Sequence, residues 1–234
     1  MKKLLIVVLL FFVFSTAFAQ TETERNRVFV KGGFSYMGFR TPKLSESVNT
    51  TLDNRLLGLS LTLGGDYLFS KEAGLEYAGE LTTVFNFPAS GSSLINGKKP
   101  SYDSDFFGLT ARTGVNKIFE FNEKIDFVAG AGFFCDALIN HLRIIYSKAN
   151  KYYSEQGNTS LSVGLDFNFE SRFRLTDRIK ASAGITADVS FYSLGSEYSY
   201  THRGNYFEAN KSLLKSSWTF AVNATLYGGI IFSF

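Results

Sequence analysis

Hydrophobic and polar residues alternate over long stretches of this chain. Between Leu161 and Leu175 the odd positions are apolar with one exception, and the even positions carry serine, glycine, asparagine or charged side chains. Because successive side chains of a β-strand point to opposite faces of a sheet, this period of two predicts a strand with one apolar and one polar face. The stretch that begins at Leu57 shows the same alternation.

The pattern recurs often enough to predict eight strands. Short connections, SKEA, EFNE and LTDR, follow the second, fourth and sixth strands, whereas long segments follow the first, third, fifth and seventh. Strands joined by tight turns are antiparallel, so we expect an all-β, eight-stranded up-and-down barrel with every long loop at one end. The expected strands are residues 27–39, 55–69, 74–87, 105–119, 124–138, 159–175, 179–192 and 217–234.

Alternation by itself does not say whether lipid or water surrounds the barrel, since soluble barrels of the lipocalin type alternate with their apolar face inward. Here the apolar face carries a single charge, Lys117, close to a strand end, while the polar face carries many charges of both signs. A charge at the middle of a lipid-facing strand costs about 2–4 kcal/mol. Aromatic residues of the apolar face gather toward the strand ends, as in the girdles of membrane barrels. The sequence therefore predicts a transmembrane β-barrel with its polar face inside.

An eight-stranded barrel is narrow enough for side chains to fill it. We expect opposite charges in the lumen to pair and to close it, because buried charges require compensation; a narrow ion path is the alternative. Besides Lys31, Asp66 and Arg174, the pattern places a polar network inside: Glu76, Glu80, Arg112, Asp126, Asp166, Glu170, Arg172, Lys180 and Asp188.

The start of the chain has a different character. Lys2 and Lys3 precede an apolar run of eleven residues, and an A-x-A site ends at Ala19. This arrangement predicts a cleaved signal peptide over residues 1–19 and a barrel domain over residues 20–234. Loss of the two lysines lowers the formal charge from +3 to +1, which is no footprint for nucleic acid. The lone cysteine, Cys135, excludes an internal disulfide.

The last strand coincides with the end of the chain and finishes on an aromatic residue. Its closing positions are Tyr227, Gly229, Phe232 and Phe234. This spacing resembles the assembly signal of bacterial outer-membrane barrels, and the whole pattern resembles their small eight-stranded members, the OmpA-type transmembrane domain and the OmpX, OmpW and opacity types. The resemblance implies periplasmic termini, outward-facing long loops, contact with outer-membrane lipids and lipopolysaccharide, and recognition by the barrel assembly machinery.

Two histidines, His141 and His202, fall in the third and fourth long segments. Some members of the resembled group modify lipid A with a histidine, a serine and an acid, and Ser147, Ser154, Glu155 and Glu197 stand nearby in the sequence. Their spacing matches no motif known to us. A metal site built from the histidines and Asp136 also lacks ligand spacing, so no catalytic residue, metal or cofactor is predicted.

The third and fourth segments are rich in tyrosine and basic residues, which suit binding of anions and broad surfaces. The alternative is ordinary anchoring of aromatic side chains at the membrane interface, with Ile144 and Ile145 extending the fifth strand above the membrane. We expect a non-enzymatic outer-membrane protein with an envelope role and an adhesive surface for a host or matrix ligand. The alternatives are a lipid A-modifying enzyme, and a narrow channel or transporter for small hydrophobic solutes or ions. The candidate binding residues are Arg143, Tyr146, Tyr152, Tyr153, Arg203 and Tyr206.

Overall fold

Every regular element of the computed structural model is a β-strand, within the residues that it describes: 26–38, 55–86, 89–92, 101–147, 152–203, 206–211, 215–217 and 221–234. In these ranges no helix has the length and hydropathy needed to cross a bilayer. The expected signal peptide, residues 1–19, lies outside them. The strands are β1 Asn26–Gly38, β2 Arg55–Ser70, β3 Leu75–Asn86, β4 Ala89–Ser92, β5 Ser101–Asn122, β6 Ile125–Ser147, β7 Tyr152–Arg174, β8 Ile179–Arg203, β9 Tyr206–Lys211, β10 Lys215–Ser217 and β11 Ala221–Ser233.

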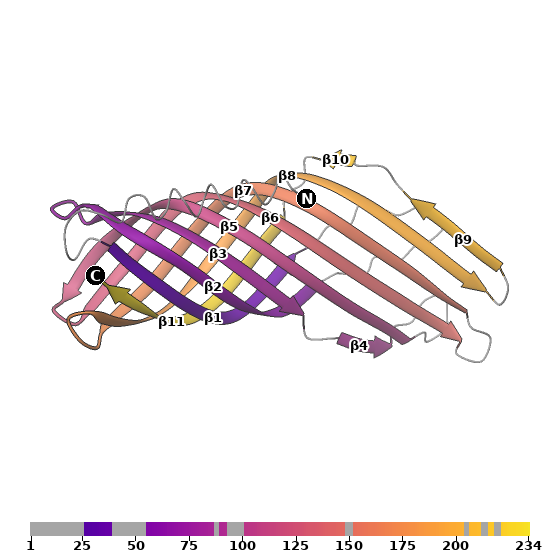
Figure 1. The fold of residues 1–234 in the computed structure, drawn as a ribbon, viewed down its shortest axis with the longest axis horizontal. Coiled ribbons are helices and arrows are strands. Elements are labelled where there is room, and N and C mark those ends of the chain that lie inside the picture. The colour runs from indigo at the N-terminus through magenta and orange to yellow at the C-terminus, as the bar shows by residue number, and fades with distance from the viewer. Residues whose placement is uncertain are drawn as a thin grey trace.

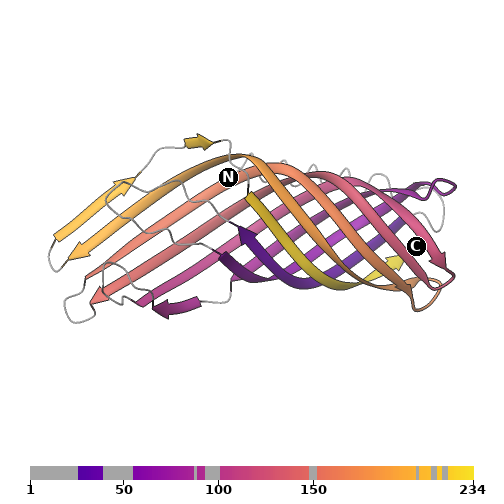
Figure 2. The same ribbon diagram turned by 180° about the vertical axis from the view of Figure 1, so that it is seen from behind.

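Eight of these strands close into a barrel. Neighbours pair in the order β1, β2, β3, β5, β6, β7, β8 and β11, always antiparallel, and β11 returns to pair with β1. Figures 1 and 2 show the tilted strands wrapping around a single axis. The eight-stranded antiparallel barrel that the alternation predicts is therefore confirmed.

The four strands β5 to β8 are much longer than the others. They run for 22, 23, 23 and 25 residues, against 12 to 16 for the remaining barrel strands. Their extra length forms one end of the elongated molecule, with β4 and β9 at the two sides (Figure 1). We call this end the protruding sheet: residues 101–106, 140–147, 152–158 and 196–203, together with β4, which pairs with β5, and β9, which pairs with β8.

The fifth and seventh strands are longer than the sequence predicts, and their ends occupy segments that were expected to be long loops. β6 continues to Ser147 and β7 begins at Tyr152, so the two strands stay paired almost to their connection. β8 likewise continues to Arg203 and forms a hairpin with β9. Beyond the membrane both faces of a sheet meet water, so the alternation that marks a lipid-spanning strand fades. The extension at Ile144 and Ile145, which pair with β5 and β7, is confirmed.

The outer wall of the barrel is apolar. Large hydrophobic side chains are exposed on every barrel strand, including Phe34 at 61%, Leu57 at 62% and Leu226 at 63%. Exposed apolar patches of such extent mark a surface that contacts lipid or protein. Lys117, the exception on this face, donates a hydrogen bond from its ammonium to the carbonyl of Ala73 in the turn below it. The wall therefore has the chemistry expected for lipid.

Specific residues fix the conformation of the short turns. Gly74 ends the turn between β2 and β3 with a φ of 58°, and a Cβ there would lie 2.9 Å from the Ile118 carbonyl oxygen. In the next turn the Asn122 side chain accepts hydrogen bonds from the backbone N–H groups of Lys124 and Ile125, both at 2.9 Å. These turns fix the register of the strand pairs they join.

An arginine at Leu226 tests the lipid-facing assignment. Leu226 lies near the middle of β11, opposite Phe34 and Ile185, so Leu226→Arg is expected to destabilise the barrel by about 2–4 kcal/mol. Urea unfolding in lipid vesicles measures the effect. Leu175→Arg is the matched control, because Leu175 is similarly exposed, at 60%, but lies at the turn end, where the cost is about 0–1 kcal/mol. Equal costs at the two positions would contradict the assignment.

Candidate functional site

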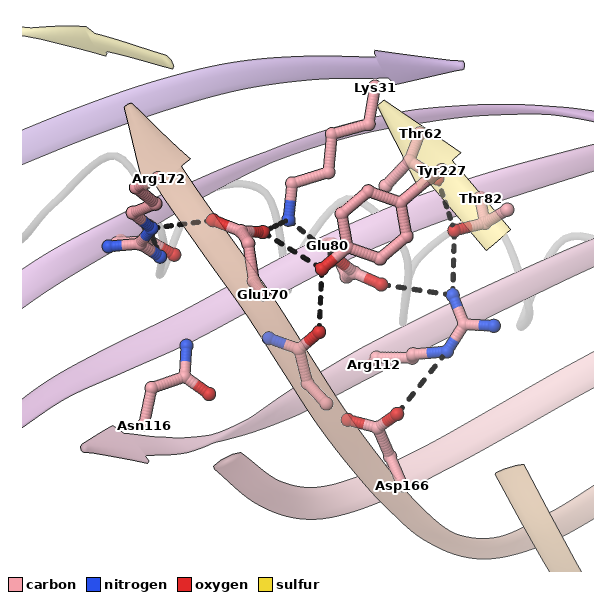
Figure 3. Close-up of polar contacts among 12 residues, drawn as sticks. Lys31, Thr62, Glu80, Thr82, Arg112, Asn116, Asp166, Glu170, Arg172 and Tyr227 are labelled. Atoms are coloured by element: carbon pink, nitrogen blue, oxygen red, sulfur yellow. Dashed lines mark hydrogen bonds and ion pairs between the residues drawn. The ribbon is translucent and has the colours of Figure 1, made fainter. Parts of the chain in front are cut away.

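The inner face of the barrel holds a continuous set of buried polar and charged side chains. They come from every barrel strand, because each inward position alternates with a lipid-facing one. Apolar side chains fill the spaces between them: Phe29, Val84, Val128, Phe134, Leu138 and Ile231. This interior is the candidate site, and Figure 3 shows its central part.

Arg172 organises the half of the lumen nearest the short turns. Its guanidinium donates to both carboxylate oxygens of Glu76, at 2.9 and 2.7 Å, to Asp66 at 3.0 Å and to Glu170 at 2.5 Å. Arg27 adds a second cation to Glu76 at 2.7 Å. Arg172 is 1% exposed and Glu76 is fully buried. Four strands, β1, β2, β3 and β7, are thereby joined through one group.

Glu170 carries the network toward the centre of the barrel. Its second oxygen accepts from the Lys31 ammonium at 2.6 Å and from the Tyr227 hydroxyl at 2.8 Å. The ammonium also lies over the Phe29 ring, 4.1 Å from its centroid, and the Tyr227 ring, at 4.5 Å. Gly184 makes room for this arrangement, since a Cβ there would lie 2.6 Å from the Tyr227 hydroxyl.

Arg112 organises the half nearest the protruding sheet. Its Nε and Nη2 donate to the two oxygens of Asp188 at 2.8 and 2.7 Å, a bidentate pairing. Its Nη1 donates to Glu80 at 3.0 Å and to the Thr82 hydroxyl at 2.7 Å. Asp166 lies farther away, with Oδ1 3.6 Å from Nε. Figure 3 shows Glu80 between the Arg112 and Glu170 groups, so the two halves form one network.

Each of the nine residues of the expected lumen network faces the interior. Asp126 and Lys180, the pair nearest the turns, meet at 2.5 Å. Arg174 is directly opposite Lys180 and so lies on the same face of the sheet, but it is exposed because it stands at the turn end of β7. Sequence reasoning also left out Arg27 and Asp136, although Arg27 alternates with the exposed Val28 and is buried.

The four positions of the terminal signal separate into two environments. Tyr227 points into the lumen and is 7% exposed, whereas Phe232 and Phe234 lie on the outer wall at 39% and 63%. Gly229 pairs with Lys31 and Ser182, and a Cβ there would lie 2.5 Å from the Val30 carbonyl oxygen. Tyr227 is thus part of the internal network as well as of the terminal pattern.

The six candidate binding residues occupy strand positions, not loops. Arg143 and Tyr146 belong to β6, and Arg203 and Tyr206 to the ends of β8 and β9. Tyr152 pairs with Ser147, and Tyr153 pairs with Ile145 and His202. His141 is opposite Asp105 and Gly157. Within the described ranges, no three His, Cys, Asp or Glu side chains form a group suited to holding a metal ion.

Arg172 is expected to be indispensable to the closed lumen. Arg172→Gln leaves Glu76, Glu170 and Asp66 without their shared cation, and removing one partner of a buried ion pair typically costs about 3–5 kcal/mol. Urea unfolding of the refolded barrel in lipid vesicles measures this loss. Arg174→Gln, two residues away on the exposed end of the strand, serves as the control with an expected change within about 0.5 kcal/mol. A stability loss no larger than that of the control would show that Arg172 does not hold the network.

Structural comparison places the fold among solved membrane barrels. No protein-family model matches the sequence, and no curated protein matches it. A major outer-membrane protein of Thermus thermophilus is similar with a TM-score of 0.56 and 12% identity, over 89% of this chain and 99% of that one. Neisserial surface protein A gives 0.45 and 14%, over 92% and 100%. The attachment invasion locus protein Ail of Yersinia pestis gives 0.46 and 13%, over 91% and 100%.

The Thermus match supports the fold alone, and the two lower scores add nothing to it. Together with the closed ring of eight antiparallel strands and the exposed apolar wall, it agrees with the expectation from the sequence. The chain has the fold of the small outer-membrane β-barrels, with a lipid-facing exterior and a charged interior.

Proposed function

We propose that this protein is a non-enzymatic barrel of the bacterial outer membrane that binds a ligand outside the cell through its protruding sheet. The observation that carries the proposal is the paired extension of β5 to β8 past the barrel. Spanning a membrane needs only about 9–11 residues per strand. The additional length of these four strands serves no purpose in the bilayer, and an external role accounts for it.

A hydrogen-bonded sheet is a good platform for binding. Its backbone is already ordered, so association loses less conformational entropy than with a flexible loop. The register places Asp103, Arg143 and Glu155 in one row across β5, β6 and β7, and continues the row to Tyr200 on β8. Arginine and tyrosine are enriched at protein interfaces, so this row supports an adhesive role.

The charge of the β6–β7 hairpin favours an anionic ligand. Residues 140–158 contain three basic side chains, Arg143, Lys148 and Lys151, against one acid, Glu155. Arginine pairs readily with sulfate, phosphate and carboxylate groups. We therefore propose an anionic glycan of a host surface or matrix as the ligand class, with lipopolysaccharide phosphates as the neighbouring alternative. The barrel assembly machinery and outer-membrane lipids are the other partners we propose.

The interior supports the non-conducting form of this proposal. Ion pairs shorter than 3.1 Å cross the lumen from Arg172 to Asp66 and Glu76, and from Arg112 to Asp188. We expect such contacts across a narrow tube to block the passage of a hydrated ion. A channel or transporter function through the lumen would require both groups to separate.

Shortening the β6–β7 hairpin tests the adhesive sheet. Replacement of residues 144–154 by Asn-Gly joins the opposed positions Arg143 and Glu155 through a two-residue turn that antiparallel strands favour. The refolded barrel should keep its strand spectrum but bind an immobilised sulfated polysaccharide at least about tenfold more weakly, a difference of about 1.4 kcal/mol. Surface plasmon resonance measures the affinity.

Point variants provide the matched comparison. Arg143→Ala is expected to weaken polysaccharide binding, whereas Arg178→Ala, an exposed arginine at the opposite end of the barrel, should leave it unchanged. A lipopolysaccharide-coated surface in parallel distinguishes the two anionic ligand classes. Undiminished binding of both surfaces by the shortened protein would refute the role of the sheet.

The enzymatic alternative rests on two histidines that lie on different strands. His202 of β8 is opposite Tyr153, and His141 of β6 is opposite Gly157. A nucleophile and its base must lie within hydrogen-bond reach of each other, and the spacing of these residues in the sequence matches no motif that supplies such a pair.

Histidine variants test this alternative directly. His141→Ala and His202→Ala are expected to leave the lipid A mass profile of cells expressing the protein identical to that of cells expressing the unaltered protein. Mass spectrometry of extracted lipid A gives the readout, with cells lacking the protein as reference. A profile that changes on removal of the protein, and again with either variant, would establish the enzyme instead.

A further inference from the structure

The two halves of the lumen differ in their ratio of carboxylates to cationic side chains. In the half nearest the turns, four carboxylates face four cations: Asp66, Glu76, Asp126 and Glu170 with Arg27, Lys31, Arg172 and Lys180. In the half nearest the protruding sheet, four carboxylates face one cation: Glu80, Asp136, Asp166 and Asp188 with Arg112. Lys31 reaches Glu80 only at 4.0 Å. Among the described residues, this second half is thus rich in uncompensated acid.

Among these acids, Asp166 has a buried oxygen without a hydrogen-bond donor. It is 7% exposed, and its Oδ1 has no hydrogen-bond donor. The nearest cationic atom, Arg112 Nε, is 3.6 Å away and already donates to Asp188 at 2.8 Å. Asp166 and Asp188 are also directly opposite in the β7–β8 register, and like charges in that relation destabilise a sheet.

Asp136, in the same half of the lumen, also has a carboxylate oxygen without a close hydrogen-bond donor. Asp136 is 4% exposed; its Oδ1 accepts from the Ser162 backbone N–H at 3.1 Å, but the donor nearest its Oδ2 is Asn223 at 3.5 Å.

We propose that this half of the lumen binds one hard cation beside Asp166. An uncompensated buried carboxylate is strongly unfavourable, and a bound cation supplies the missing positive charge. The donors beside Asp166 are carboxylate oxygens, which suit Ca²⁺, Mg²⁺ or an alkali ion. The excess of acid over base favours a divalent ion, and Ca²⁺ tolerates irregular oxygen sets. Because no three acidic side chains in the described part of the barrel form a ready metal cluster, the ion retains part of its water shell.

The proposed cation site is independent of the adhesive sheet. Its residues belong to the barrel wall, and the ion would reach them from the end opposite the Arg172 group. Binding there locks the Arg112 half of the network closed, so calcium should stabilise the folded barrel without altering ligand binding by the sheet.

Calcium titration of the refolded protein tests the site. The protein in detergent micelles, treated with chelator and dialysed, is titrated with CaCl₂ at pH 7 by isothermal calorimetry, with NaCl as a separate arm. One calcium per barrel is expected. Asp166→Asn should weaken its affinity at least about tenfold, and Asp136→Asn should weaken it less. Asp126→Asn is the matched control with unchanged affinity, because Asp126 is already paired with Lys180 in the other half.

Circular dichroism and urea unfolding accompany each titration, so that a misfolded variant is recognised. Calcium should raise the urea midpoint of the unaltered protein and of Asp126→Asn, but not that of Asp166→Asn. No calcium binding by the unaltered protein would overturn the proposal, and so would equal affinities for the unaltered protein and Asp166→Asn. A third outcome would also overturn the proposal. If the barrel binds no calcium but its urea midpoint rises on acidification, and Asp166→Asn removes that rise, a proton compensates the charge of Asp166.

Discussion

The compensation of buried charge is the constraint on which this structure depends. The lumen holds carboxylates and guanidinium groups that are almost fully buried, and an isolated charge in such surroundings is strongly unfavourable. Arg172 meets the requirement by binding three carboxylates that come from β2, β3 and β7. Because each partner stands on a different strand or at a different height, the ion pairs bind the walls of the barrel to one another. The same contacts that satisfy the charges therefore link the walls across the lumen.

The outer wall of the barrel is apolar where the lumen is charged. Side chains such as Phe34 and Leu226 are more exposed than buried, and their surroundings must be apolar for the fold to be stable. The backbone satisfies both requirements with one periodicity, since each strand presents alternate residues to lipid and to the lumen. Lys117 shows how an exception is accommodated: its position near a strand end lets the ammonium reach a turn carbonyl. On the described barrel strands, charge on the outer wall is thus confined to a strand end.

The sequence predicted those parts of the fold that the membrane imposes. Alternation in lipid identified the eight barrel strands and the inward direction of residues such as Glu76 and Arg112. It did not predict the strands of the protruding sheet, where lipid no longer selects one face of the strand. The pairing of residues such as Arg143 with Asp103 and Glu155 rests on backbone register, which polarity alone does not encode. The partners of Arg172 were likewise beyond prediction, because they depend on the stagger of strands around the closed ring.

The stability of the barrel does not explain the unequal charge of the two halves of the lumen, whereas the cation binding that we propose does. A barrel that needed only to be closed would be served by balanced pairs throughout, as around Arg172, because each unmatched acid costs stability. Arg112 instead stands among four carboxylates, and its bidentate contact with Asp188 leaves Oδ1 of Asp166 3.6 Å from Nε and without a hydrogen bond. The unbalanced half lies on the side of the protruding sheet, away from the short turns. Its acidity is therefore directed toward the end at which we place the ligand-binding surface, where ions from the medium can neutralise it.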